Sequence, residues 1–145
     1  MRNLGLKKPT ILSDKTSVYS KAKFTVTNEF DMFVGVPSLP AQKLLEKYSA
    51  IRGAFMTAHN PFGCVVSPKE NSYQTDRLVS DIKLCGYVSF DGFGASVSCD
   101  WSEQSFFVID PSDDFLSSVF TKYNQDAFVI VKNNSMVDLV MNPNI

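Results

Sequence analysis

One helix near the middle of the chain constrains the fold more than any other sequence feature. Ser67-Pro68-Lys69-Glu70 is a capping box with proline at the first helical position, so the Ser67 hydroxyl is expected to cap a backbone N–H. An apolar stripe follows at helical spacing and stops at Gly86. Apolar runs typical of strands lie on both sides of this helix. The chain therefore combines helices with a sheet.

The remaining periodicity predicts two more helices and a series of strands. The helices are expected to begin near Pro40 and after Asp110-Pro111. Strand patterns occupy residues 24–26, 32–36, 53–58, 87–90, 106–109, 127–131 and 136–140, the last two as a hairpin around Asn133-Asn134. The predicted class is α/β (α+β), a single-domain mixed sheet with helices packed on it in the order β-α-β-α-β-β-α-β-β.

Charge is distributed unevenly along the chain. The 145 residues carry 14 Lys and Arg against 15 Asp and Glu, a net charge of −1. Residues 1–23 nevertheless sum to +5 and the remainder to −6. We predict a basic N-terminal arm, residues 1–23, followed by one α/β domain, residues 24–145. Since the body is acidic, nucleic acid is not expected as a partner except through the arm.

The start of the chain does not have the pattern of a secretory signal. Lys7, Lys8, Asp14 and Lys15 interrupt every apolar run there. No stretch of the sequence approaches the roughly 20 apolar residues of a membrane span. We therefore expect a cytoplasmic protein that does not bind a membrane, and a protein partner stays open.

A single histidine and three cysteines restrict metal and redox chemistry. Cys64, Cys85 and Cys99 form no C-x-x-C pair, and carboxylates such as Asp113 suit a helix N-terminus better than a metal. The sequence thus predicts no metal site and no cofactor. Cys85 ends the apolar stripe of the central helix and is expected to be buried.

The sharpest turn signal follows the strand pattern of residues 53–58. Thr57, His59 and Asn60 precede Pro61 there, and the chain then leads into the capped helix. Ligands of open α/β sheets gather outside the carboxyl ends of strands, so a binding site is expected at this point. The proline keeps Asn60 out of right-handed helical geometry. The competing interpretation is a structural turn in which Asn60 caps the loop backbone.

Asn71 provides a second polar position near this turn. It lies seven residues before Leu78 and so on the buried face of the central helix. A buried amide without partners costs about 1–3 kcal/mol, so Asn71 should bond to the loop after Thr57, and Gln74 is expected to join it. Ligand binding and a tie between loop and helix are both consistent with this pattern.

Several motifs together resemble a known family. They are Ala54-Phe-Met-Thr-Ala-His-Asn-Pro, Ser67 and Asn71 at a helix start, Gly86-Tyr87, Glu103-Gln-Ser-Phe-Phe-Val and Tyr123-Asn-Gln-Asp-Ala-Phe-Val. In this order, over roughly residues 32–131, they resemble the small bacterial and phage family called domain of unknown function 3293. The resemblance implies a site and no activity. Its residues here are Thr57, Asn60, Asn71, Glu103, Ser105 and Gln125.

This set predicts a polar pocket at one rim of the sheet. A strand starting near Ser105 would share that rim if it ran antiparallel to the strand ending at Thr57. Amides and hydroxyls with one carboxylate suit a nucleotide-like or other polar small ligand, and Trp101, Tyr87 or Tyr123 offers a stacking face. We therefore favour a small binding or regulatory protein over an enzyme.

Two other functions stay open at this point. His59 and Glu103 form a candidate general acid/base pair of a hydrolase or transferase, because histidine titrates near neutrality. Cys64 lies close enough in sequence to His59 to suggest a thiol nucleophile. The small size and acidic body also suit a phage or mobile-element protein that inhibits a host system through protein–protein contact.

Overall fold

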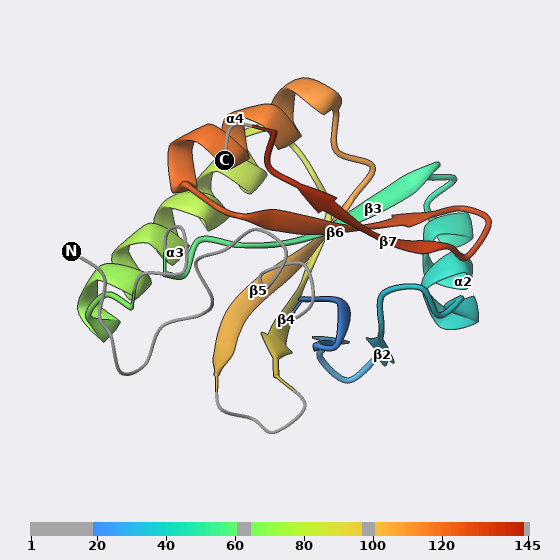
Figure 1. The fold of residues 1–145 in the computed structure, drawn as a ribbon. Helices are drawn as coiled ribbons and strands as arrows, with labels where there is room; N and C mark the ends of the chain where they lie inside the picture. The colour runs from blue at the N-terminus through green and yellow to red at the C-terminus, as the bar shows by residue number, and fades with distance from the viewer. Residues whose placement is uncertain (1–18, 61–64, 97–100, 144–145) are drawn as a thin grey trace.

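Seven strands form one sheet in the order β2-β1-β4-β5-β3-β6-β7, and three helices pack on it within the residues that the computed structural model describes, 19–60, 65–96 and 101–143 (Figure 1). The strands are β1 (Lys23–Val26), β2 (Phe30–Met32), β3 (Arg52–Thr57), β4 (Ser89–Ala95), β5 (Ser102–Ile109), β6 (Ala127–Lys132) and β7 (Val137–Met141). The helices are α2 (Leu39–Lys47), α3 (Pro68–Leu84) and α4 (Asp113–Tyr123).

Each of these helices begins at a serine cap. Ser67 Oγ accepts a hydrogen bond of 3.1 Å from the backbone N–H of Glu70, as the capping box predicts. Ser38 and Ser112 cap α2 and α4 in the same way. These bonds satisfy N–H groups that the first turn of a helix leaves without partners. The start of the central helix is therefore confirmed.

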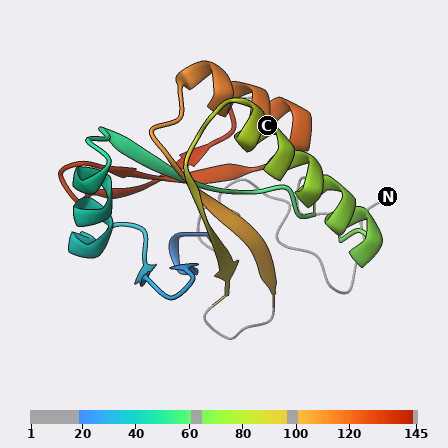
Figure 2. The same cartoon turned by 180° about the vertical axis from the view of Figure 1, so that it is seen from behind.

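The two faces of the sheet carry separate apolar cores, because successive strand residues point to opposite faces. Met56, Phe106 and Phe128 point toward α3 and α4, on what we call the α3/α4 face. Phe55 and Phe107 lie on the opposite face, the α2 face, with α2 and the segment around Ala22. Figures 1 and 2 show α3 and α4 together on one side and α2 apart from them.

All six strand pairings are antiparallel, which corrects the predicted mixed sheet. The crossovers through α3 and α4 each join two strands that have one other strand between them: β5 lies between β3 and β4, and β3 lies between β5 and β6. The crossovers connect parallel strands, but these strands are not neighbours. Strand–helix alternation in the sequence does not reveal such an insertion. The class itself, helices packed on one sheet, is confirmed.

The N-terminal part of the domain differs from the expected element order. Strands β1 and β2 form a hairpin, so the order begins β-β-α, and the second strand is Phe30–Met32 rather than 32–36. Thr25 and Asp31 pair across this hairpin, and the Thr25 hydroxyl donates to the Asp31 carboxylate at 2.7 Å. Gly35, with φ of 80°, ends the extended segment that the apolar pattern suggested.

Two further expectations concern single residues. Cys85 is exposed rather than buried, because α3 ends at Leu84 and Cys85 is its C-cap. Cys64 and Cys99 lie outside the described residues. Of the predicted arm, residues 1–18 also lie outside the described residues, and Tyr19 and Ala22 are buried. Within the described ranges, every helix is too short or too polar to cross a membrane.

Candidate functional site

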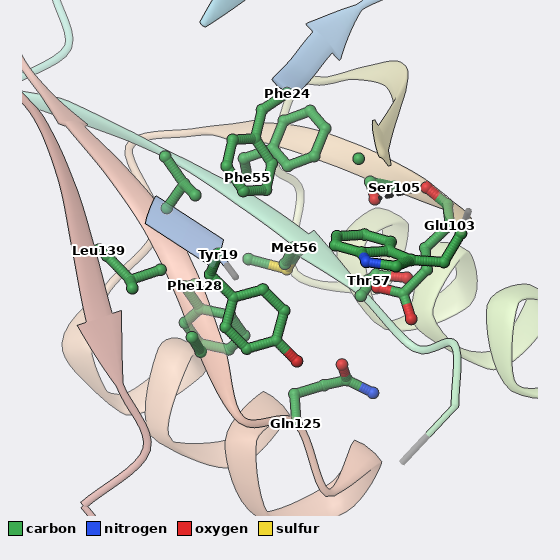
Figure 3. A pocket seen from close by; sticks show the side chains of 14 residues that line it. Tyr19, Phe24, Phe55, Met56, Thr57, Glu103, Ser105, Gln125, Phe128 and Leu139 are labelled. Atoms are coloured by element: carbon green, nitrogen blue, oxygen red, sulfur yellow. Dashed lines mark hydrogen bonds between the residues drawn. The ribbon is translucent and has the colours of Figure 1, made fainter. Parts of the chain in front are cut away.

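A pocket opens on the α2 face, where the ends of β3, β5 and β6 meet. About 420 Å³ of empty space lies between its walls and its open mouth, and about 30 Å³ of this can hold the centre of a water molecule. Figure 3 shows Thr57, Glu103, Ser105 and Gln125 toward one side and Leu139 on the other. The lining residues are Tyr19, Phe24, Phe55, Met56, Thr57, Gly94, Trp101, Glu103, Ser105, Gln125, Ala127, Phe128, Val129 and Leu139.

Strand register explains why the polar residues converge. Thr57 at the end of β3 pairs with Ser105 in β5, and the two strands are antiparallel, as the site prediction required. Residues that pair directly across two strands point to the same face of the sheet. Glu103 lies two residues before Ser105 in β5 and therefore points to this face as well. Glu103 and Ser105 are both buried. The register alone therefore brings two hydroxyls and a carboxylate to one wall.

The two hydroxyl protons on this wall already have acceptors. Thr57 Oγ1 donates to the carbonyl oxygen of Gln104 at 2.7 Å and accepts from the backbone N–H of His59 at 3.1 Å. Ser105 Oγ donates to the carbonyl oxygen of Glu103 at 3.0 Å. Each hydroxyl has one proton, so toward a ligand both groups act as acceptors.

Gln125 ties the pocket to the turn after β3. It follows α4 and is 3% exposed. Its Nε2 donates to the carbonyl oxygens of His59 and Tyr123, each at 3.0 Å. Both amide protons are thus engaged, and Oε1 is the group that Gln125 offers to a ligand. Figure 3 places this carboxamide on the same side of the pocket as Thr57.

Aromatic side chains form much of the remaining wall. Tyr19 and Trp101 meet edge to face with ring centroids 6.2 Å apart, and Phe24 and Phe55 do so at 5.5 Å. The Tyr19 hydroxyl donates to the buried carboxylate of Asp126 at 2.9 Å, which fixes the orientation of its ring. Of the three predicted stacking residues, Trp101 is the one in the pocket.

Asn60 and Asn71 lie at the turn and on α3, outside the pocket lining, and bond to each other. Asn71 Oδ1 accepts from the backbone N–H of Asn60 at 2.9 Å, and Asn71 Nδ2 donates to Asn60 Oδ1 at 3.0 Å. Asn60 Oδ1 also accepts from the backbone N–H of Val66 at 3.2 Å. Asn60 has φ of 45°, a left-handed conformation that asparagine tolerates. The pair ties the loop to the helix, as one of the two interpretations expected.

Replacing Asn71 by alanine should destabilise the protein by about 1–3 kcal/mol. The substitution leaves the N–H of Asn60 and one acceptor site of its side chain without partners in a part-buried place. Urea denaturation would measure the loss. Ser72→Ala, at the exposed next position of α3, should change stability by less than about 0.5 kcal/mol. Equal midpoints for the two variants would mean that the pair contributes nothing.

Two other predicted site residues do not line the pocket. His59 contributes its carbonyl oxygen to Gln125 but is not a lining residue, whereas Glu103 is. Gln74 lies on α3, where its Oε1 accepts from the Arg77 guanidinium at 2.9 Å. The proposed acid/base pair of His59 and Glu103 therefore stays a prediction without a shared cavity to support it.

Tyr87 and Tyr123 take part in contacts between elements instead of lining the pocket. The Tyr87 hydroxyl bonds to Ser112 at the start of α4. The Tyr123 hydroxyl donates to the Asp81 carboxylate of α3 at 2.5 Å, and Lys122 Nζ lies 2.9 Å from the same oxygen. Burial raises the pKa of Tyr123, and the hydrogen bond to Asp81 raises it further. These contacts join α3 to α4 on the face opposite the pocket.

Asp81 should make stability depend on acid pH. Burial raises the pKa of its carboxyl, but hydrogen bonds from Lys122 and Tyr123 outweigh this and hold it below the ordinary 3.8. A pKa lowered by folding stabilises the protein above about pH 4, and that stabilisation disappears as pH falls through the folded-state pKa. Asp81→Asn should thus cost about 1 kcal/mol at pH 7, since Lys122 is part exposed, and much less at pH 3.

Urea denaturation of both proteins at the two pH values would measure this difference. Asp76→Asn, at an exposed position of the same helix, serves as the control and should show a smaller and less pH-dependent change. A cost for Asp81→Asn that is the same at pH 3 and pH 7 would contradict the role assigned to the ion pair.

Sequence reasoning missed the apolar part of the pocket. Tyr19 belongs to the predicted arm, and Phe24 and Phe55 have the pattern of ordinary core residues. Gly92 and Gly94 are a signal that could have been used, because glycines two apart in a strand indicate that another chain segment approaches closely on that face. Among the described residues, no group of three or more His, Cys, Asp or Glu side chains is placed to hold a metal ion.

The comparisons with known proteins identify one family. A family model described as a protein of unknown function (DUF3293) matches residues 56–128, half of the 145-residue chain. The matched region is shorter than the 32–131 of the resemblance, and it contains Thr57, Glu103, Ser105 and Gln125 together with both asparagines of the turn. No curated protein and no solved structure matches the chain.

Proposed function

We propose that this chain, which belongs to the DUF3293 family of proteins of unknown function, is a binding protein whose pocket on the α2 face takes a polar small molecule. One observation carries the proposal. Thr57, Glu103, Ser105 and Gln125, nominated from sequence, share a single pocket with Trp101. Buried polar side chains at the end of an apolar cavity are the usual arrangement for orienting a small ligand.

The size of the pocket limits how a ligand enters. The space in the whole pocket that can hold the centre of a water molecule, about 30 Å³, admits a group no larger than about two water molecules, at roughly 10–15 Å³ each. A ring system must therefore stay largely outside this space, while a small polar group enters it. A nucleoside-like ring with one polar substituent is compatible with this division, as is any aryl or alkyl group of similar size.

A thermal-shift screen tests the proposal. The compounds should include nucleosides, nucleotides, amines, alcohols and carboxylates. A ligand at 100 times its Kd stabilises the folded state by about 2.7 kcal/mol, which corresponds to a rise in Tm of about 5 °C or more. Ala127→Leu fills the pocket and should abolish this rise, whereas Val140→Leu, at an exposed position of β7, should leave it intact.

Two results would overturn the proposal. The first is a screen in which no compound raises the Tm of the wild-type protein. The second is a rise in Tm that survives Ala127→Leu, because the ligand would then bind elsewhere on the protein.

A further inference from the structure

A second hollow lies between α2, the β1–β2 hairpin and β4. About 330 Å³ of it can hold the centres of water molecules, compared with about 30 Å³ in the pocket described above. The two hollows share no lining residue. We call the second one the lysine groove, and its lining residues are Glu29, Phe30, Pro40, Lys43, Leu44, Lys47 and Phe90.

One wall of the lysine groove is a strip along α2. Residues three or four positions apart in a helix lie on the same side of it. The strip consists of Pro40, Lys43, Leu44 and Lys47. Its two lysines are four residues apart and both are exposed, so their ammonium groups lie along the same wall.

Neither of these lysines has an ion pair within the part of the chain that the structure describes, where the paired cations are Arg52, Lys122 and Lys132. Glu29 lines the groove from the hairpin side and is not paired with either lysine. The lining therefore has a net charge of +1, although residues 24–145 sum to −6. The groove is a local positive site on an acidic domain.

The floor of the groove is apolar and held in place from below. Phe30, Leu44 and Phe90 are half-buried and pack against the core of the α2 face. Phe30 meets Phe107 edge to face at 6.2 Å, and Phe90 meets Tyr48 in the same way at 6.1 Å. These contacts fix the two floor rings. An apolar side chain placed on them would leave water at the foot of the lysine wall.

Charge and shape restrict what can occupy the groove. Residues 1–18 of this chain contain four basic residues and one acidic residue, so the lysines repel them. A nucleic acid carries phosphates along its whole length and would meet the acidic remainder of the domain beyond the two lysines. The exposed walls do not enclose a small molecule, as ligand pockets usually do.

We propose that the lysine groove binds a short acidic segment of a partner protein. An apolar side chain of that segment lies on Phe30, Leu44 and Phe90, and its carboxylates lie beside Lys43 and Lys47. Peptide-binding grooves combine apolar anchor sites with charged groups in this way. The groove is separate from the pocket of the proposed function, so neither proposal depends on the other.

A ¹H–¹⁵N titration of the full chain with synthetic peptides tests the proposal. The probe is an acetylated and amidated hexapeptide with two aspartates on each side of Leu-Phe. One control peptide has asparagine for all four aspartates, and another has Ser-Ser for Leu-Phe. The probe should shift the backbone amides of Lys43, Leu44 and Lys47 with a Kd of about 1 mM or lower, as expected for a short flexible peptide. Each control should bind at least about 3-fold more weakly.

Charge variants should change the affinity in opposite directions. The double variant Lys43→Gln, Lys47→Gln should weaken binding of the probe by about 3- to 30-fold, since an exposed ion pair contributes a factor of up to about 5. Glu29→Gln removes a repelling carboxylate and should tighten binding by about 1.5- to 5-fold. The double variant Lys69→Gln, Lys83→Gln removes the same charge from exposed positions of α3 and should change the Kd by less than about 1.5-fold. All five positions are exposed, so these variants should fold as the wild type does.

Several results would overturn the proposal. They include equal affinities of the two double variants for the probe, equal binding of the aspartate and asparagine peptides, and no shift of the groove amides at about 5 mM probe, several times the expected Kd. Tighter binding of an oligothymidylate than of the probe would identify a nucleic acid as the occupant instead. Groove amides that shift with protein concentration in the absence of peptide would identify a second copy of this chain.

Discussion

Phe107→Ala is expected to lower the free energy of unfolding by about 3–5 kcal/mol, a large part of the roughly 5–15 kcal/mol that stabilises a domain of this size. Phe107 lies in the middle of β5 and is 0% exposed. Its ring covers Gly53 of β3 and meets the ring of Phe30 edge to face, with centroids 6.2 Å apart. Truncation leaves a cavity over β3 and β5 on the α2 face that cannot close, because both strands are held in the sheet by their other neighbours.

Phe93→Ala is the matched control, since Phe93 lies on the adjacent strand β4 and is 39% exposed. The same change there should cost less than about 1 kcal/mol. Urea denaturation of the two variants measures the difference in midpoint. Similar midpoints would contradict the assignment of Phe107 to the centre of the core on the α2 face.

Gly92→Ala is expected to cost about 3 kcal/mol or more and to weaken the pocket as well. A Cβ at this position would overlap the carbonyl oxygen of Thr25 in β1, and it would lie 2.9 Å from the ring of Phe55. The backbone of β1 cannot rotate away as a side chain can, so the β1–β4 pairing must open. Phe24, which directly precedes Thr25 in β1, lines the pocket and would move with the strand.

Gly94→Ala provides the control for this clash. Gly94 is two residues further along β4 and faces the same side, but a Cβ there would lie 3.3 Å from the side chain of Phe24, which can shift slightly. We expect a cost below about 1 kcal/mol for this variant. Denaturation measures the two stabilities. Equal losses for Gly92→Ala and Gly94→Ala would show that β1 does not approach β4 as closely as described.

Much of the fold could be predicted because local signals agreed with it. The Ser67 cap, the apolar stripe through Leu78 and the turn at Asn133 each depend on residues close in sequence, and each element is present. Strand order depends instead on contacts between distant residues. The position of β5 between β3 and β4 does not alter the pattern of apolar residues along the sequence. The sheet was therefore expected to be mixed.

The site was predictable in part for the same reason. The turn after Thr57 is a local signal, and the antiparallel pairing with Ser105 follows from the assumption of a shared rim. The sequence could not show that Asn60 and Asn71 bond to each other and not to a ligand. A buried amide requires hydrogen-bond partners in either case. The donor protons of Gln125 and Ser105 are engaged by carbonyl groups that only the folded backbone positions.

The most direct test of the ligand pocket is the ¹H–¹⁵N spectrum of the labelled protein with and without a compound that raises its Tm in the thermal-shift screen. We predict the largest shifts at the backbone amides of Thr57, Glu103 and Ser105, the side-chain amide of Gln125 and the indole N–H of Trp101. Shifts gathered instead on α3 around Tyr73 and Arg77, with these five signals unmoved, would contradict the account.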